Sequence, residues 1–105
     1  MIELIAAVDK LVAEELKRAN ENFPLFHSDH EGYAVIQEEI DEAMSANREA
    51  MKHKESAWDW IKANVQTNAC EEIKAMREVL GHGIAEMIQI AAMCEKFIQS
   101  QEARK

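Results

Sequence analysis

Apolar residues recur at spacings of three and four along most of the chain, which is the period of an α-helix. The first such stripe consists of Leu4, Ile5, Val8, Leu11, Val12 and Leu16. It predicts a helix from about residue 2 to residue 19, with this stripe facing the core. Pro24 disfavours helical geometry at Phe23, so a loop should follow. Because Phe23, Leu25 and Phe26 are too apolar for a free linker, we expect this loop to pack onto the helices.

A second helix is predicted from about residue 29 to residue 53. Ser28 and Glu31 have the spacing of a capping box, in which two side chains satisfy backbone N–H groups at the start of a helix. The expected core positions of this helix are Tyr33, Ile36, Ile40, Ala43, Met44 and Asn47.

A shorter third helix is expected to begin at Ser56, a residue type that favours the N-cap position. It would place Trp58, Ile61 and Val65 on one face. The sequence "QTN" at residues 66–68 is the turn that we expect after it.

The last helix should extend from about residue 69 to residue 99. Its apolar positions alternate at spacings of three and four, as in the seam of a helical bundle. They are Ile73, Met76, Leu80, Gly83, Met87, Ile90, Cys94 and Phe97. Each glycine inside a helix costs about 1 kcal/mol relative to alanine. At Gly81 and Gly83, therefore, either the helix kinks or another segment approaches its backbone closely.

The predicted fold class is all-α, as a single domain of residues 1–105 folded into a four-helix-type bundle. The scarcity of glycine (three) and proline (one) agrees with this class. A chain of 105 residues builds only a small core. The methionines Met76, Met87 and Met93 on the last helix suggest that part of its surface is buried in a homodimer or homotetramer.

The formal net charge of −8 argues against non-specific binding to nucleic acid, which requires a basic surface. The chain has no apolar run of about 18 residues and no basic leader, so we expect a cytoplasmic protein without a membrane segment. Cys70 and Cys94 lack the spacing of a metal or redox motif and are expected to be buried free thiols.

The most distinctive polar feature is the motif E-E-x-x-E formed by Glu38, Glu39 and Glu42 in the second helix. It presents three carboxylates from about one helical turn, and Glu39 lies toward the apolar stripe. Carboxylate oxygens are the ligands that Mg²⁺ takes from proteins, together with water and substrate phosphates. Spacing alone leaves two interpretations open: a solvated acidic face or a divalent-metal site.

A second polar segment lies in the last helix, where His82, Glu86 and Gln89 share a face. Glu86 flanks the seam residues Gly83 and Met87, so its carboxylate can reach the interior. A buried carboxylate is costly unless it is paired or binds a metal. The alternative is that Glu86 faces solvent or pairs with a lysine.

The segments "FHSDHEGYAVIQEEIDEA" and "AEMIQIAAMCEKF" resemble the MazG-like all-α nucleoside triphosphate pyrophosphohydrolases, in particular a small subgroup from phages and prophages. In that family E-E-x-x-E on one helix and E-x-x-D on a later helix hold Mg²⁺, which binds the triphosphate. Glu86 matches the second motif, and Gln89 stands where aspartate is usual. The resemblance implies cleavage of (deoxy)nucleoside triphosphates to monophosphate and pyrophosphate.

The resemblance also implies roles for single residues. Mg²⁺, with Mn²⁺ as an alternative, would be held by Glu38, Glu42 and Glu86, with Gln89 as a weaker ligand. Glu39 would be the general base or a further ligand. Candidate nucleotide contacts are His30, Lys54, Lys62 and Trp60. Trp60 would stack on a base or fill an oligomer interface.

Other classes of function fit the sequence less well. His27 and His30 lack the further ligands that zinc requires. A di-iron bundle needs Glu-x-x-His on two helices, a spacing that does not occur. The second candidate is a helical oligomerisation or interaction protein that retains the fold without the chemistry.

Overall fold

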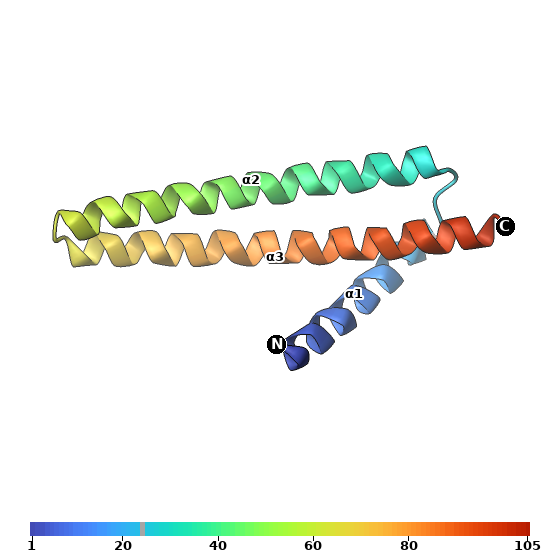
Figure 1. Cartoon of the computed structure of the whole chain (residues 1–105), viewed down its shortest axis with the longest axis horizontal. Helices are drawn as coiled ribbons and strands as arrows, with labels where there is room; N and C mark the ends of the chain where they lie inside the picture. Colours follow the sequence, from blue (N-terminus) through green and yellow to red (C-terminus); the bar gives the residue numbers. More distant parts are fainter. Residues whose placement is uncertain (24) are drawn as a thin grey trace. The chain divides into compact units, whose positions relative to one another are not determined.

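The computed structural model describes residues 1–23 and 25–105, and within them the chain forms three helices and no strand. These are α1 (Ile2–Asn22), α2 (Asp29–Lys62) and α3 (Gln66–Ala103), shown in Figure 1. The predicted all-α class is confirmed. Two compact units result: residues 1–40 with 86–105, and residues 41–85. We describe each unit separately.

The predicted separate third helix is wrong, because α2 continues without interruption through Ser56 to Lys62. The described part of the chain therefore has three helices where four were expected. None of them is long and apolar enough to cross a membrane.

Cap chemistry explains where α2 begins. The Glu31 N–H donates to Oγ of Ser28 at 3.1 Å, and the Gly32 N–H donates to the Ser28 carbonyl at 3.1 Å. Two amides of the first turn are thereby satisfied, as a serine N-cap requires. The predicted start at residue 29 is confirmed.

The turn between α2 and α3 lies at residues 63–65, not at the predicted residues 66–68. Asn64 adopts a left-handed conformation with φ of 61°. The Val65 N–H donates to the Trp60 carbonyl at 2.9 Å and the Asn64 N–H donates to the Ile61 carbonyl at 3.0 Å. This pair of bonds is a Schellman motif, which ends a helix at an αL residue.

In the first unit, the loop before α2 is anchored to the end of α3. The buried Oγ of Ser100 accepts the Phe26 N–H at 2.9 Å and donates to the Lys96 carbonyl at 2.7 Å. Arg104 donates to the Phe26 carbonyl at 3.2 Å and also bonds Asp29. The predicted packing of the loop is confirmed for Phe26, which is buried. Phe23 and Leu25 are exposed, and Pro24 lies outside the described residues.

Helices α2 and α3 run antiparallel in this unit (Figure 1), and Gly32 on α2 lies against the ring of Phe97 on α3. A methyl group added to Gly32 would lie 2.7 Å from Cδ2 of Phe97 and 2.9 Å from Cδ2 of Phe26. Only glycine leaves room for the two rings at this crossing.

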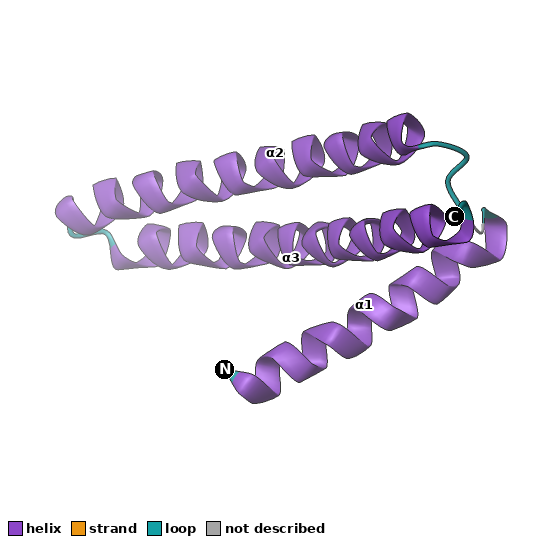
Figure 2. Cartoon of the chain, turned by 45° about the vertical axis from the view of Figure 1, so that its right-hand side comes forward, coloured by secondary structure: helices purple, strands orange, loops and turns teal. Residues whose placement is uncertain are grey.

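Helix α1 has no buried residue, so the predicted core role of its apolar stripe is wrong. Leu4, Ile5, Val8 and Leu11 are exposed, because within the unit no helix covers this face (Figure 2). Near the C-terminus of α1, Nδ2 of Asn20 donates a hydrogen bond of 3.5 Å to Oε1 of Gln99 on α3.

The second unit is built on alanine. Ala43, Ala50 and Ala57 are buried on α2 at seven-residue spacing, and Ala69 is buried on α3. A seven-residue repeat keeps one face of a helix toward its partner, and alanine allows close approach. His53 and Glu72 cross-link the two helices, with 2.8 Å between Nδ1 and Oε2.

Many of the expected core residues do not lie in the core of either unit. Several predicted core positions are exposed in one unit or the other: Tyr33, Ile40, Met44, Asn47, Trp58, Ile61, Ile73, Met87 and Cys94. Helix α3 continues through Gly81 and Gly83. A methyl group on Gly83 would lie 3.5 Å from Cβ of Ala46, so the helices approach one another closely there.

Candidate functional site

Glu86, at the start of the first-unit part of α3, carries a buried carboxylate oxygen. Its Oε2 is buried and accepts no hydrogen bond from the described residues. A buried acceptor without a donor loses the hydrogen bonds to water that it makes in the unfolded chain and makes none in the folded protein. This lowers the stability of the fold by about 1–3 kcal/mol. The structure thus favours the interior position of Glu86 over the solvent-facing or lysine-paired alternative.

Glu39 lies in the same unit and also has a buried carboxylate oxygen, Oε2. The contact of Gly32 with Phe97 sets the level of the two helices. Glu39 is seven residues after Gly32 on α2, and Ile90 is seven residues before Phe97 on α3. Because the helices are antiparallel, Glu39 and Ile90 lie at about the same position along the helix axes. Glu86, four residues before Ile90, is therefore displaced from Glu39 by about one helical turn along the axis. Two half-buried carboxylates thus come from facing helices of one unit.

The other predicted ligands are less enclosed. Glu38 is exposed, and Gln89 is half-buried on α3. Glu42 is exposed and belongs to the second unit. Of the E-E-x-x-E motif, only Glu39 lies at the edge of the core, as its position beside the apolar stripe predicted.

The described residues contain no group of three or more His, Cys, Asp or Glu side chains that could hold a metal ion. Mg²⁺ differs from zinc in needing only one or two protein carboxylates, since phosphates and water complete its octahedron. The buried oxygens of Glu39 and Glu86 fit that requirement, whereas a closed all-protein cage is not formed.

The predicted nucleotide contacts are distributed over both units. His30 is exposed in the first turn of α2, in the first unit. Lys54, Lys62 and Trp60 belong to the second unit. Nζ of Lys62 lies 3.4 Å from Oδ1 of Asp59 and 5.7 Å from the ring centroid of Trp58.

One of the two tryptophans is placed differently from the prediction. Trp58, expected in the core, is 57% exposed. Trp60 is less exposed and lines a pocket with Ser56, Asp59 and Ala63. Both side chains are accessible to a ligand or a partner.

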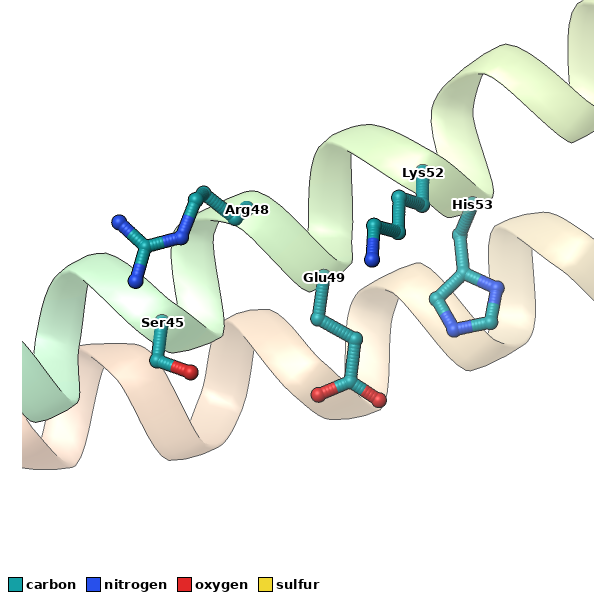
Figure 3. Close-up of a pocket in the computed structure, with 5 residues that line it drawn as sticks. All are labelled: Ser45, Arg48, Glu49, Lys52 and His53. Atoms are coloured by element: carbon teal, nitrogen blue, oxygen red, sulfur yellow. The ribbon is translucent and has the colours of Figure 1, made fainter.

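Sequence reasoning did not identify a pocket of about 530 Å³ on α2 in the second unit (Figure 3). It is lined by Ser45, Arg48, Glu49, Lys52 and His53. The sequence does contain a signal for it: these polar residues recur at spacings of three and four, so they form a polar stripe on one face of the helix.

Cys70 and Cys94 are free thiols, as predicted, but both are exposed and not buried.

No family model matches the chain, and comparison with curated proteins and with solved structures gives no match either.

Proposed function

We propose that the protein is a metal-dependent nucleoside triphosphate pyrophosphohydrolase that cleaves (d)NTP to (d)NMP and pyrophosphate. The observation that supports this proposal is the buried, unbonded Oε2 of Glu86. Such an oxygen gains most from a cation, because a positive charge offsets the lost hydration. The second support is the resemblance of its two acidic segments to MazG-like enzymes.

In this proposal Glu86 and Glu39 would hold one Mg²⁺ or Mn²⁺, and Glu38 and Gln89 of the same unit would supply further oxygens. The metal, when bound, neutralises phosphate charge and lowers the pKa of a coordinated water. Glu39 has a second role as the base that accepts the proton of the attacking water. Its position at the core edge would keep that carboxylate oriented toward the reacting phosphate.

One of the predicted nucleotide contacts lies in the same unit as Glu39 and Glu86. His30, exposed in the first turn of α2, offers a ring nitrogen to the substrate. Lys54, Lys62 and Trp60 belong to the second unit and are not part of the proposed site.

We also propose that the active form is a homodimer or homotetramer in which association completes a four-helix-type bundle. The support is the uncovered apolar face of α1, with Ile2 85% exposed and Leu4, Ile5 and Leu11 also exposed. Contiguous apolar patches of this kind on soluble proteins mark interaction surfaces.

A panel of NTPs and dNTPs with Mg²⁺ or Mn²⁺, assayed for pyrophosphate release, tests the enzymatic proposal. We expect release with at least one nucleotide and its loss in Glu38→Gln and Glu86→Gln. Absence of release with every nucleotide and metal would refute the proposal. Activity that survives both substitutions would refute the assignment of the site.

The second candidate is a non-catalytic oligomerisation or interaction protein. It is favoured by the apolar surface that α1 leaves exposed. Both candidates predict an oligomer, which light scattering detects and Ile5→Glu should dissociate. The pyrophosphate-release assay separates them, since the non-catalytic candidate predicts an oligomer without metal-dependent turnover.

A further inference from the structure

The pocket at Ser45, Arg48, Glu49, Lys52 and His53 is made of residues that the proposed function does not use. All five side chains project from α2, and Figure 3 shows Glu49 between Ser45 and His53 along the helix. Arg48 and Lys52 are four residues apart and therefore lie on the same face of the helix.

The two cations of this pocket lack an acidic partner. Among the basic residues of the second unit, Lys62 pairs with Asp59 at 3.4 Å and Lys74 pairs with Glu71 at 3.2 Å. No ion pair with a described carboxylate is formed by the remaining lysines and arginines of the unit, which are Arg48, Lys52, Lys54 and Arg77. Of these four, Arg48 and Lys52 line the same pocket.

The remaining lining groups add hydrogen-bonding capacity. Ser45 provides a hydroxyl that donates or accepts. His53 uses Nδ1 in its 2.8 Å contact with Glu72 on α3, which fixes the ring and leaves Nε2 for another partner. The pocket, of about 530 Å³, is an open depression in the surface, since four of its five lining residues are exposed.

We propose that this pocket binds an oligophosphate through two adjacent phosphoryl groups, one facing Arg48 and the other facing Lys52. A guanidinium binds phosphate in a bidentate manner and an ammonium binds it as a point charge. Pyrophosphate and the tail of a nucleotide share this chemistry. The carboxylate of Glu49 repels the anion, so the affinity depends on the balance between the positive charges of Arg48 and Lys52 and the negative charge of Glu49.

Isothermal titration calorimetry in metal-free buffer tests the proposal, with pyrophosphate as the probe. We expect saturable binding that is weaker for orthophosphate, which offers a single phosphoryl group. A second arm with a nucleoside triphosphate distinguishes the sources: equal affinity indicates that only the phosphates are recognised, and tighter binding indicates that the nucleoside is also contacted.

Two substitutions in the pocket should weaken pyrophosphate binding, and a third should strengthen it. Arg48→Gln and Lys52→Gln should each weaken pyrophosphate binding about tenfold or more, the equivalent of one charge-assisted hydrogen bond. Glu49→Gln should tighten binding, because it removes the opposing charge. Lys74→Gln is the matched control, since it removes one positive charge from the same unit outside the pocket.

Circular dichroism of each variant establishes that the helices are retained. Absence of saturable binding by the wild-type protein would overturn the proposal. So would an equal loss in Lys74→Gln and Arg48→Gln, since that result would indicate a diffuse electrostatic effect.

Discussion

At the scale of single residues, two polar side chains of the first unit are buried and neither belongs to the hydrophobic pattern. Ser100 is 1% exposed and Lys96 is 5% exposed. Ser100 is explained by its hydrogen bond to the Phe26 N–H, a partner 74 residues away in sequence. Periodicity cannot predict such a contact, because it reports only which face of a helix is apolar.

The two glycines at helix crossings should respond oppositely to alanine. Gly32→Ala is expected to lower stability by about 1–3 kcal/mol, because the methyl group would overlap the rings of Phe97 and Phe26. Gly83→Ala should raise it by up to about 1 kcal/mol, because Ala46 lies at an ordinary contact distance and alanine favours the helix. Urea unfolding of both variants measures the difference.

The pair serves as its own control, since both substitutions are Gly→Ala within a helix. Equal destabilisation by the two variants would contradict the crossing described at Gly32.

Lys96 is expected to make stability depend on pH. Burial lowers the pKa of its ammonium, an effect that Glu31 partly opposes. A lysine whose folded pKa is depressed destabilises the fold at low and neutral pH, and this penalty is lost as pH rises from the folded pKa to the ordinary value of 10.5. Lys96→Met should therefore be more stable than wild type at pH 7, by an amount that shrinks toward pH 10.5.

Chemical denaturation at pH 7, 9 and 10.5 measures this difference. The Nζ of Lys96 also lies 4.9 Å from the centroid of the Phe26 ring, a contact that methionine replaces with a sulfur–aromatic one. A stability difference that stays constant with pH would show that packing, and not charge, determines the effect.

At the scale of helices, local chemistry predicted some ends well and others poorly. The start of α2 follows from Ser28, whose cap acts through neighbouring residues. The continuation of α2 past Ser56 could not be predicted from local chemistry, because serine is tolerated inside a helix that tertiary packing stabilises. The end at Asn64 depends on one left-handed residue.

The choice of core residues was the weakest prediction at this scale. Large apolar residues at helical spacing were expected inside, yet Ala50 and Ala57 are buried and Trp58 is exposed. When two helices approach closely, only small side chains fit between them and the large ones are displaced to the flanks. A pattern of apolar residues does not reveal interhelical distance.

Ala50→Leu tests the close approach of the helices in the second unit. Ala50 is 0% exposed, so three added carbon atoms have no free space and should cost about 1–3 kcal/mol. Met44→Leu, at an exposed position of the same unit, is the control and should change stability by less than about 0.5 kcal/mol. Thermal unfolding of both measures the effect, and an unchanged midpoint in Ala50→Leu would contradict close packing.

At the scale of the whole molecule, the described residues form two units, and neither covers all of its apolar surface. The first unit leaves the α1 face open, and the second leaves Trp58 and Ile61 exposed. The resemblance-based proposal and the non-catalytic alternative both require an oligomer to bury this surface. They differ in whether the carboxylates of Glu39 and Glu86 bind a cation.

The candidate site was predicted in part. The sequence identified Glu86 as a carboxylate beside an apolar seam and Glu39 as the member of its motif nearest the core. The pocket at Arg48 and Lys52 was not predicted, because the lack of ion-pair partners for a cation becomes visible only when the positions of all nearby carboxylates are known.

The most direct test of the central proposal is a Mg²⁺ or Mn²⁺ titration followed by thermal unfolding. If Glu86 binds the cation in the folded state alone, metal at about one hundred times Kd should stabilise the wild-type protein by about 2.7 kcal/mol. Glu86→Gln should lose this shift, and Glu95→Gln, an exposed position on the same helix and unit, should retain it. A wild-type midpoint that does not respond to metal, or an equal response in Glu86→Gln, would contradict the account.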